Sequence, residues 1–336
     1  MAPTLPPAYC GLSKVEREFL IPVHLDEHEN YTSMNQVWKT RLFADERVFG
    51  EGDIREILEF SRPELAGLSL TPVGAGTDNR VYRLGEGLAL RIPRTIDASR
   101  RLQKEVRWMP RVTQNLPLRC PTVICDFAPT VRGSFRWVVY DWIDGTPGNE
   151  EVRLDTAENA IRLAEWIIAL RAVDPCAGPG PGKHNFGRGG DLRKRALRIS
   201  HLIGRHAPMF DAEKALAIWT RALESSEQEF DHRWLHGDLQ PSNILTRNGS
   251  ITGVVDFGGL GVGDTACELL ACWTSFGPKG RAAMREVLQP DDAAWHRGRG
   301  WALATAIEAF DYYRAMDHPI VSQSENTLRA VLCDSS

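Results

Sequence analysis

The residue types best suited to chemistry lie in the segment 235–269, which reads LHGDLQPSNILTRNGSITGVVDFGGLGVGDTACEL. Asp238 and Asn243 are five positions apart in a stretch led by His236, and Asp256 follows thirteen positions after that amide. The letters NIL, RNG and ITGVVDF predict a β-hairpin, which would place a carboxylate, an amide and a second carboxylate on one platform. Such oxygens suit Mg²⁺ on a triphosphate, and a free carboxylate can meet an incoming hydroxyl. The spacing therefore favours Mg²⁺-dependent phosphoryl transfer.

The same segment resembles the aminoglycoside phosphotransferase family, the antibiotic-kinase and choline-kinase branch of the protein-kinase-like fold. HGD alone is a common turn and DFGG a common strand end, but HGDLQPSN followed by VVDFGG and GDTACEL is specific to the family. The resemblance covers residues 50–330 and implies that Asp238 is the catalytic base and that Asn243 and Asp256 bind the metal. It also implies that His236 supports the catalytic loop.

The GDTACEL stretch carries the resemblance further and limits the kind of substrate. It implies that Asp264 caps and anchors the following helix, while Glu268 stands where the family usually has Asp, a conservative departure. Only eight positions separate Asp256 from Asp264, and no APE motif follows. A protein kinase needs a longer activation segment there. The acceptor is therefore expected to be a small hydroxyl compound.

A nucleotide site is expected earlier in the chain. GAGTDN lies between two strand-like segments, where glycines let the backbone approach phosphate oxygens. The next segment, LALRIPR, supplies Arg91 where kinases use Lys, and arginine can hold phosphate bidentately. Glu105 on the following helix is the expected partner of Arg91, although a solvated arginine and a surface glutamate are the simpler alternatives. From the loop, the expected nucleotide-binding residues are Gly74, Gly76, Thr77, Asp78 and Asn79.

The segment WVVYDWIDG at 137–145 falls where the purine-binding hinge of such a fold is expected. Tyr140, Asp141 and Trp142 are its candidate nucleotide contacts. Backbone groups would read the base there, so the residue types leave the choice between ATP and GTP open. Tyr140 and Trp142 could equally be core aromatics.

Hydrophobic alternation predicts an α+β chain whose first third reads β-β-β-α-β-β. The strands are expected in LSLTPV, RVYRL, LALRIP, TVICDF and FRWVVYDW, and a helix from Asp97 to Val112 would be opened by Asp97 as its cap. A short earlier helix would have Asp53 as its cap and one apolar face formed by Ile54, Ile57 and Leu58.

From about Asn149 the pattern becomes helical. One amphipathic helix in TAENAIRLAEWIIALRAV would share a face among Ile161, Ala164, Ile168 and Leu170. Further helices are expected in 191–205, 211–229, 265–288 and 292–315. With the resemblance, this implies a bilobal protein-kinase-like fold, with a small antiparallel β-sheet N-lobe containing one main helix and a larger, mainly helical C-lobe. The expected boundaries are 1–45 for an N-terminal extension, 46–141 for the nucleotide-binding N-lobe and 142–336 for the C-lobe.

The helical part should bind the acceptor. Between 231 and 336 there are 13 acidic and 9 basic residues, a weaker acidic bias than a polycationic aminoglycoside would require. Most aromatic residues there are expected in the core, and a minority could stack on a sugar or base. This balance favours a less cationic acceptor, such as a macrolide or a nucleoside antibiotic of capuramycin type. The candidate acceptor residues are Trp273, Trp301, Glu308, Asp311 and Tyr312.

Composition excludes several other classes. The net charge of −4 gives no reason to bind nucleic acid or a membrane surface, and no apolar run reaches the 18 residues of a membrane span. The start has no basic segment followed by an apolar stretch, so we expect no secretory signal, and seven scattered cysteines fit a reducing cytoplasm. We expect a cytoplasmic, antibiotic-inactivating kinase that uses Mg²⁺ with ATP or GTP, as a monomer or homodimer. The alternatives are a metabolic kinase acting on choline, fructosamine or a homoserine-like acceptor, and a non-catalytic pseudokinase.

Overall fold

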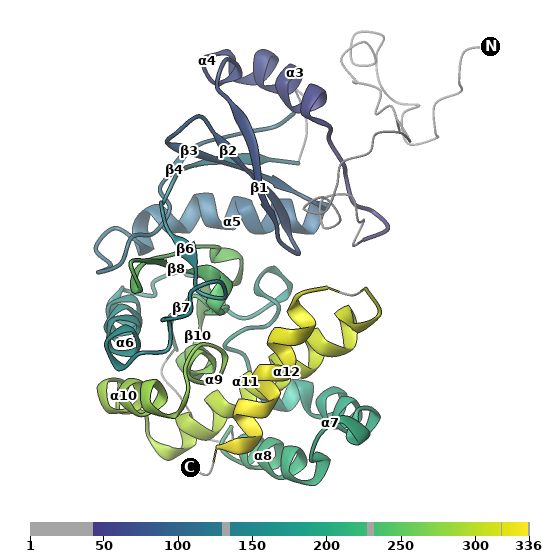
Figure 1. Ribbon diagram of the computed structural model, residues 1–336, viewed down its shortest axis with the longest axis vertical. Coiled ribbons are helices and arrows are strands. Elements are labelled where there is room, and N and C mark those ends of the chain that lie inside the picture. The colour runs from purple at the N-terminus through teal and green to yellow at the C-terminus, as the bar shows by residue number, and fades with distance from the viewer. Residues whose placement is uncertain (1–42, 130–134, 227–231, 317, 335–336) are drawn as a thin grey trace, which may run out of the picture. The chain divides into compact units, whose positions relative to one another are not determined.

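The computed structural model describes residues 43–129, 135–226, 232–316 and 318–334. The predicted N-terminal extension, 1–45, lies outside these residues except for its last three positions. The chain divides into two compact units (Figure 1). One contains the residues up to Leu102 together with Ile124–Tyr140, and the other contains Gln103–Val123 and the chain from Asp141 on.

The first unit is built on a five-stranded sheet with the order β1-β2-β3-β5-β4. Its first three strands form an antiparallel meander in which Val81 of β2 pairs with Arg91 of β3, so Arg91 lies on the middle strand of the sheet. The five strands confirm the segments that hydrophobic alternation indicates. They are β1 (Leu70–Ala75), β2 (Asn79–Leu84), β3 (Leu88–Pro93), β4 (Val123–Phe127) and β5 (Trp137–Asp141).

Helices α3 (Glu51–Ser61), α4 (Pro63–Ala66) and α5 (Ile96–Val112) complete this part of the chain. The predicted apolar face of α3 is confirmed, because its three apolar residues are buried in the core of the unit. That core also contains Trp137, which packs edge-on against Phe49 with ring centroids 5.1 Å apart.

Both predicted helix caps in this part were wrong. Gly50 is the N-cap of α3, and Asp53 lies inside the first turn, from which its carboxylate accepts the Gly50 N–H at 2.8 Å. Helix α5 begins one residue before Asp97, and the hydroxyl of Thr95 accepts the Ala98 N–H at 3.2 Å. The unpaired N–H groups at a helix start can be bound by a side chain just before the helix or by one in its first turn. The sequence alone does not show which of the two positions is used.

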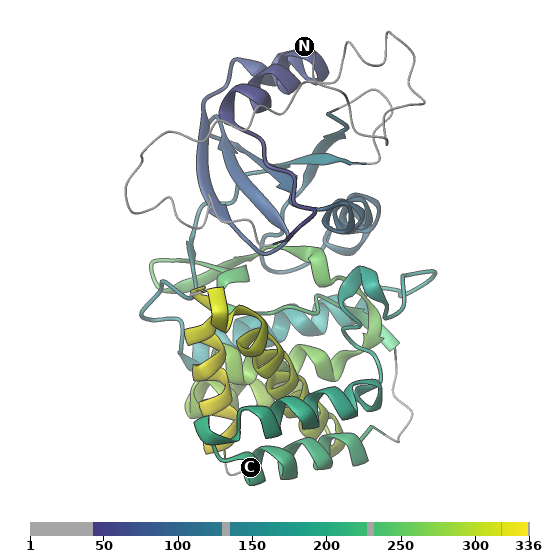
Figure 2. The ribbon, with the colours of Figure 1, turned by 90° about the vertical axis from the view of Figure 1, so that its right-hand side faces the viewer.

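The second unit is mainly helical. Its helices are α6 (Ala157–Ala172), α7 (Ala196–Arg205), α8 (Ala212–Glu224), α9 (Ala271–Thr274), α10 (Pro278–Leu288), α11 (Asp292–Tyr313) and α12 (Ile320–Cys333). Helix α11 packs beside α12, as both views show (Figures 1 and 2), and it also contacts α7 and α8. None of the described helices combines the length and the hydrophobicity that a bilayer crossing requires.

The predicted face of α6 is only half right. Ala164 and Leu170 are buried, but Ile161 is 37% exposed and Ile168 is 44% exposed. The buried face instead includes Trp166. Helix α12 was not predicted at all, because its sequence IVSQSENTLRAVLC is polar over much of its length.

Short strands in this unit position the catalytic motif. The predicted hairpin is confirmed as β8 (Ile244–Arg247) and β9 (Ser250–Val254), with β6 (Thr146–Pro147) beside β8. A separate antiparallel pair joins β7 (His232–Leu235) to β10 (Gly261–Asp264). The catalytic motif is therefore preceded by β7 and followed by β10, which pair with each other in the same unit.

Candidate active site

The loop after β7 is organised by a fully buried histidine. The Nε2 of His236 lies 3.0 Å from the carbonyl oxygen of Val255, and its Nδ1 accepts the backbone N–H of Asp238 at 3.2 Å. These partners define a tautomer with the proton on Nε2. The ring also packs edge-on against Phe257, with centroids 4.7 Å apart. His236 therefore links the loop that carries Asp238 to the segment that carries Asp256.

A buried glutamate binds the backbone of the same loop. The carboxylate of Glu268 accepts the backbone N–H groups of His236, at 3.2 Å, and Gly237, at 2.8 Å. Burial raises the pKa of Glu268 to about 7, and the two N–H donors and the positive charge of Arg171 act against this shift. The glutamate in this family position thus anchors the backbone of the loop.

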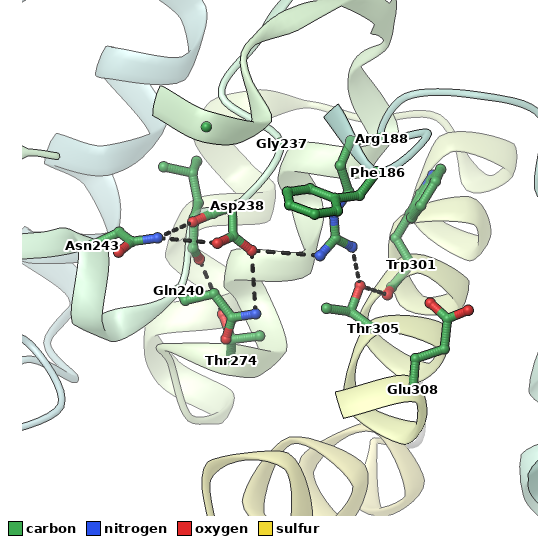
Figure 3. A network of polar contacts seen from close by, with 12 residues as sticks. Phe186, Arg188, Gly237, Asp238, Gln240, Asn243, Thr274, Trp301, Thr305 and Glu308 are labelled. Atoms are coloured by element: carbon green, nitrogen blue, oxygen red, sulfur yellow. Dashed lines mark hydrogen bonds and ion pairs between the residues drawn. The ribbon is translucent and has the colours of Figure 1, made fainter. Parts of the chain in front are cut away.

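Asp238 is held by its neighbours and still reachable by a ligand. Its side chain is 37% exposed. The Asn243 amide donates to the Asp238 carbonyl oxygen at 2.9 Å and to carboxylate Oδ2 at 3.2 Å (Figure 3). Burial raises the pKa of Asp238 above its ordinary value, Arg188 opposes the shift, and Asp256 adds to it. The arrangement fits a carboxylate that accepts a proton.

Asp256 occupies an unusual backbone conformation at the end of the hairpin. Its φ is +63°, in the left-handed region, and its carboxylate accepts the Gly258 N–H at 3.4 Å. The ammonium of Lys104 donates to the Gly258 carbonyl at 2.7 Å and to the His184 carbonyl at 3.0 Å. The backbone of Gly258 is therefore held at its N–H by Asp256 and at its carbonyl by Lys104.

Asn243 and Asp256 offer the donor set that Mg²⁺ prefers. The amide nitrogen of Asn243 is directed to Asp238, which leaves the amide oxygen as the atom available for a cation. Among the described residues there is no cluster of three or more His, Cys, Asp and Glu side chains that could hold a metal. The oxygens present fit a hard cation that is also bound by phosphates.

Asp264 anchors the helical segment that follows. Its carboxylate accepts the Ala266 N–H at 3.0 Å and so caps the 3-10 helix Thr265–Leu270. The guanidinium of Arg297 binds the same carboxylate at 2.7 and 3.2 Å. Since both side chains are nearly fully buried, this pair fixes the segment to α11.

The expected phosphate-binding loop belongs to the first unit. Gly74 lies in β1, Gly76, Thr77 and Asp78 form the turn, and Asn79 opens β2. Two cations hold this turn: Arg94 Nε donates to the Gly76 carbonyl at 2.9 Å, and Arg101 pairs with the Asp78 carboxylate at 2.8 Å. The charge of Asp78 is thereby neutralised within the unit.

Neither Arg91 nor Glu105 is the solvated surface residue of the simpler alternative. Arg91 is 8% exposed, with its guanidinium 5.7 Å from the centre of the Tyr140 ring, and Glu105 is 1% exposed. Their mutual pairing stays a prediction. Tyr140 is buried, the Asp141 carboxylate accepts the Thr122 N–H at 2.5 Å, and the Trp142 indole donates to Asp144 at 2.8 Å.

The candidate acceptor residues have different environments. Trp273 is buried against Trp295 and donates to Asp334 at 2.9 Å, so its position favours the alternative of a core aromatic. Trp301 is also buried, whereas Tyr312 is 44% exposed. The two acidic candidates, Glu308 and Asp311, both form ion pairs with basic side chains of the same unit.

Sequence reasoning missed Arg188, which lies in the glycine-rich loop before α7. Its Nη2 is 3.5 Å from Oδ1 of Asp238, and its Nη1 donates to the hydroxyl of Thr305 at 2.5 Å (Figure 3). The sequence signal for it is weak, because the loop FGRGG matches no motif with a chemical mechanism.

Comparison with known proteins identifies the family. A model described as the phosphotransferase enzyme family matches residues 69–301, more than half of the chain. The chain therefore belongs to this family and is a kinase-type phosphotransferase. No curated protein matches it.

Solved structures share its fold at low sequence identity. The GDP complex of wild-type aminoglycoside 2'-phosphotransferase-IIIa is 18% identical, with a TM-score of 0.66, covering 84% of this chain and 99% of that one. The streptomycin–ATP complex of APH(2")-IIa is 16% identical, with a TM-score of 0.54 and the same coverages. Macrolide 2'-phosphotransferase MphH from Brachybacterium faecium is 20% identical, with a TM-score of 0.57, covering 85% and 99%. The α+β kinase-like fold is thus confirmed.

Proposed function

We propose that this protein transfers the γ-phosphate of ATP or GTP to a hydroxyl group of a small molecule, with Asp238 as the base. The observation that carries the proposal is a set of hydrogen bonds that holds Asp238, Asn243 and the segment carrying Asp256 together within one unit. Asn243 donates to the Asp238 carboxylate, and His236 binds the residue immediately before Asp256.

In this mechanism, the acceptor hydroxyl donates its hydrogen bond to the carboxylate of Asp238, which takes the proton as the phosphoryl group leaves the nucleotide. Asn243 keeps the carboxylate in one orientation, and the links through His236 and Glu268 keep the loop from shifting. Phosphoryl transfer has a loose transition state, so positioning and charge neutralisation do most of the work. Base assistance contributes roughly 10²–10⁴-fold.

Asn243 and Asp256 are proposed to hold Mg²⁺, which would neutralise phosphate charge when bound. In the first unit, Arg91 and the backbone of the turn after β1 are proposed to bind the phosphates. Glu105, on α5, is proposed as the partner of Arg91. A purine nucleotide is supported by the structural relatives, whose complexes contain GDP or ATP.

An antibiotic is the acceptor class that the relatives support, since their descriptions name an aminoglycoside and macrolide phosphotransferases. Phosphorylation of the hydroxyl would inactivate such a compound and confer resistance.

Mass spectrometry tests this function directly. The protein is incubated with Mg²⁺, either ATP or GTP, and a panel of antibiotics and hydroxyl metabolites, and parallel reactions contain EDTA. We expect one compound class to gain a single phosphoryl group, only with Mg²⁺. Absence of transfer to every compound, together with absence of Mg²⁺-nucleotide binding by calorimetry, would overturn the proposal.

A further inference from the structure

Arg188 approaches the proposed base from the side opposite Asn243. Figure 3 shows the two groups on either side of Asp238, and they address different oxygens of its carboxylate. The amide of Asn243 is 3.2 Å from Oδ2, and the guanidinium of Arg188 is 3.5 Å from Oδ1. Because Arg188 donates to Thr305 of α11, its guanidinium lies between Asp238 and that helix.

The guanidinium of Arg188 makes fewer hydrogen bonds within the protein than it has donors. Nη1 donates to Thr305, but the 3.5 Å contact with Asp238 is longer than the roughly 2.7–2.9 Å of a charged hydrogen bond. Within the described residues, its buried Nε has no hydrogen-bond partner, and Nη2 has only the long contact with Asp238, so Nη2 is the donor available to a ligand. Arg297 differs from Arg188 in this respect, because it binds the carboxylate of Asp264 through two nitrogens. A side chain only 12% exposed, with donors left over beside the base, is suited to bind an oxygen group of a ligand.

The next acidic residue after Thr305 on α11 is Glu308, and its charge is neutralised by two arginines. Glu308 forms ion pairs with Arg195 at 2.7 Å and with Arg198 at 2.9 Å. Arg195 also lies over the ring of Trp301, 5.2 Å from its centre. One carboxylate therefore faces two guanidinium groups, and the local charge there is positive.

Asp311, one turn further along the helix, is also paired. Its carboxylate forms an ion pair with Arg205 at 3.0 Å and lies 2.9 Å from Nε2 of His206. A polycationic aminoglycoside needs carboxylates that can pair with its ammonium groups. Both acidic residues of this stretch are instead paired within the protein.

We propose that Arg188 binds the acceptor, and that the acceptor carries a carboxylate or carbonyl oxygen, without an ammonium group, beside the reacting hydroxyl. Phe186, 47% exposed and drawn next to Arg188 in Figure 3, offers an apolar surface for the body of such a compound. This inference rests on the proposed function and narrows its substrate class.

The test compares acceptors that differ in one charge. Glycosides and nucleosides are prepared in sets of three, with a carboxylate, a carboxamide or an ammonium group at the same carbon near a hydroxyl, and kanamycin serves as the polycation. We expect the carboxylate and carboxamide members to be phosphorylated with kcat/KM at least about 10-fold above the ammonium members. Equal rates, or preference for the ammonium members or kanamycin, would overturn the inference.

Variants then test the role of the side chain. Arg188→Met should lower kcat/KM for the carboxylate members by about 10–100-fold, mainly through KM, and Arg188→Lys should recover part of the loss. Thr305→Val should have a smaller effect in the same direction, because the hydroxyl that holds Arg188 is removed. The matched control is Arg193→Met, whose side chain is 51% exposed and pairs with its neighbour Asp191. A preference unchanged in Arg188→Met would contradict the proposal.

Assays of Mg²⁺-nucleotide binding and hydrolysis in the absence of an acceptor separate a failure of the proposed function from a failure of the acceptor inference. If the wild-type protein neither binds nor hydrolyses Mg²⁺-nucleotide, the proposed function fails and this inference falls with it. If it binds or hydrolyses the nucleotide but phosphorylates none of the carboxylate and carboxamide members, the acceptor inference alone is overturned.

Discussion

At the scale of single residues, Asp238 has two carboxylate oxygens with different surroundings. Oδ2 receives the amide of Asn243, whereas Oδ1 lies near Arg188. Such asymmetry fixes the orientation of the carboxylate without consuming it in a bidentate pair. An acceptor hydroxyl can therefore reach a carboxylate that is ordered and still 37% exposed.

Glu268 provides a prediction at this scale. Its pKa is about 7 in the folded protein against an ordinary value of 4.5, so the folded state holds its proton more tightly than the unfolded state. Its contribution to stability is then greatest below pH 4.5 and is lost as the pH rises through about 7. Glu268→Gln removes this titration. Between pH 5 and pH 8, we expect the free energy of unfolding of the variant to improve relative to wild type by about 2 kcal/mol.

Urea unfolding of both proteins at each pH measures this difference. A difference between variant and wild type that stays constant with pH would show that Glu268 is ionised throughout.

The residues that the sequence predicts and those that it misses differ in how their positions are determined. Asp238, Asn243 and Asp256 are recognisable because a short loop and a hairpin fix their spacing. Arg188 is not, because its position depends on Thr305, which lies 117 positions away in the chain. Its importance becomes visible only when both elements are folded.

At the scale of elements, the catalytic loop and the turn after Asp256 touch through their backbones. Gly237 has a φ of +80°, and a Cβ on it would lie 2.7 Å from the carbonyl oxygen of Gly259. A Cβ on Gly259 would in turn lie 2.6 Å from the carbonyl oxygen of His236. Glycine at both positions lets the two segments approach closely enough for the histidine to link them.

Gly237→Ala should therefore destabilise the protein by at least about 2 kcal/mol and abolish most phosphoryl transfer, because strain and a backbone clash coincide. The matched control is Gly204→Ala in α7, where a new Cβ meets nothing within 4 Å. That variant should be neutral or more stable by up to about 1 kcal/mol. Thermal unfolding and activity measured on both variants would contradict this account if Gly237→Ala behaved like Gly204→Ala.

Helices and strands were predicted well where a single sequence pattern determines them. They were predicted poorly where tertiary packing decides which face is buried. The strands of the first unit and the hairpin follow directly from alternation and turn residues. The face of α6 was misjudged, because Ile161 and Ile168 fit an apolar stripe in sequence but lie towards solvent. Packing partners distant in sequence decide such cases, and helical periodicity alone does not reveal them.

At the scale of the whole molecule, binding of Mg²⁺-nucleotide should stabilise the folded state by mass action. A ligand at 100 times its Kd adds about 2.7 kcal/mol, which raises the unfolding temperature by several degrees. Asp256→Ala removes a proposed metal ligand and should lose most of this rise, as should wild type in EDTA. Differential scanning fluorimetry measures it. A full nucleotide-dependent rise in Asp256→Ala would refute the ligand role.

The fold class and the family follow from one 35-residue segment, because its motif is specific enough to identify both. The acceptor could not be identified in the same way. Arg297 and Arg299 illustrate this, because the first binds Asp264 and the second binds backbone carbonyl groups of Val331 and Asp334. Charges alone do not show which groups are already paired inside the protein.

The central claim is that Asp238 acts as the base of phosphoryl transfer, and Asp238→Asn tests it most directly. The substitution keeps the shape of the side chain but removes its ability to take a proton. The measurement combines the turnover number for a phosphorylated acceptor with the Kd of Mg²⁺-nucleotide from calorimetry. We predict that turnover falls by about 10²–10⁴-fold while the Kd changes by less than about threefold. Near-native turnover in Asp238→Asn would contradict the account.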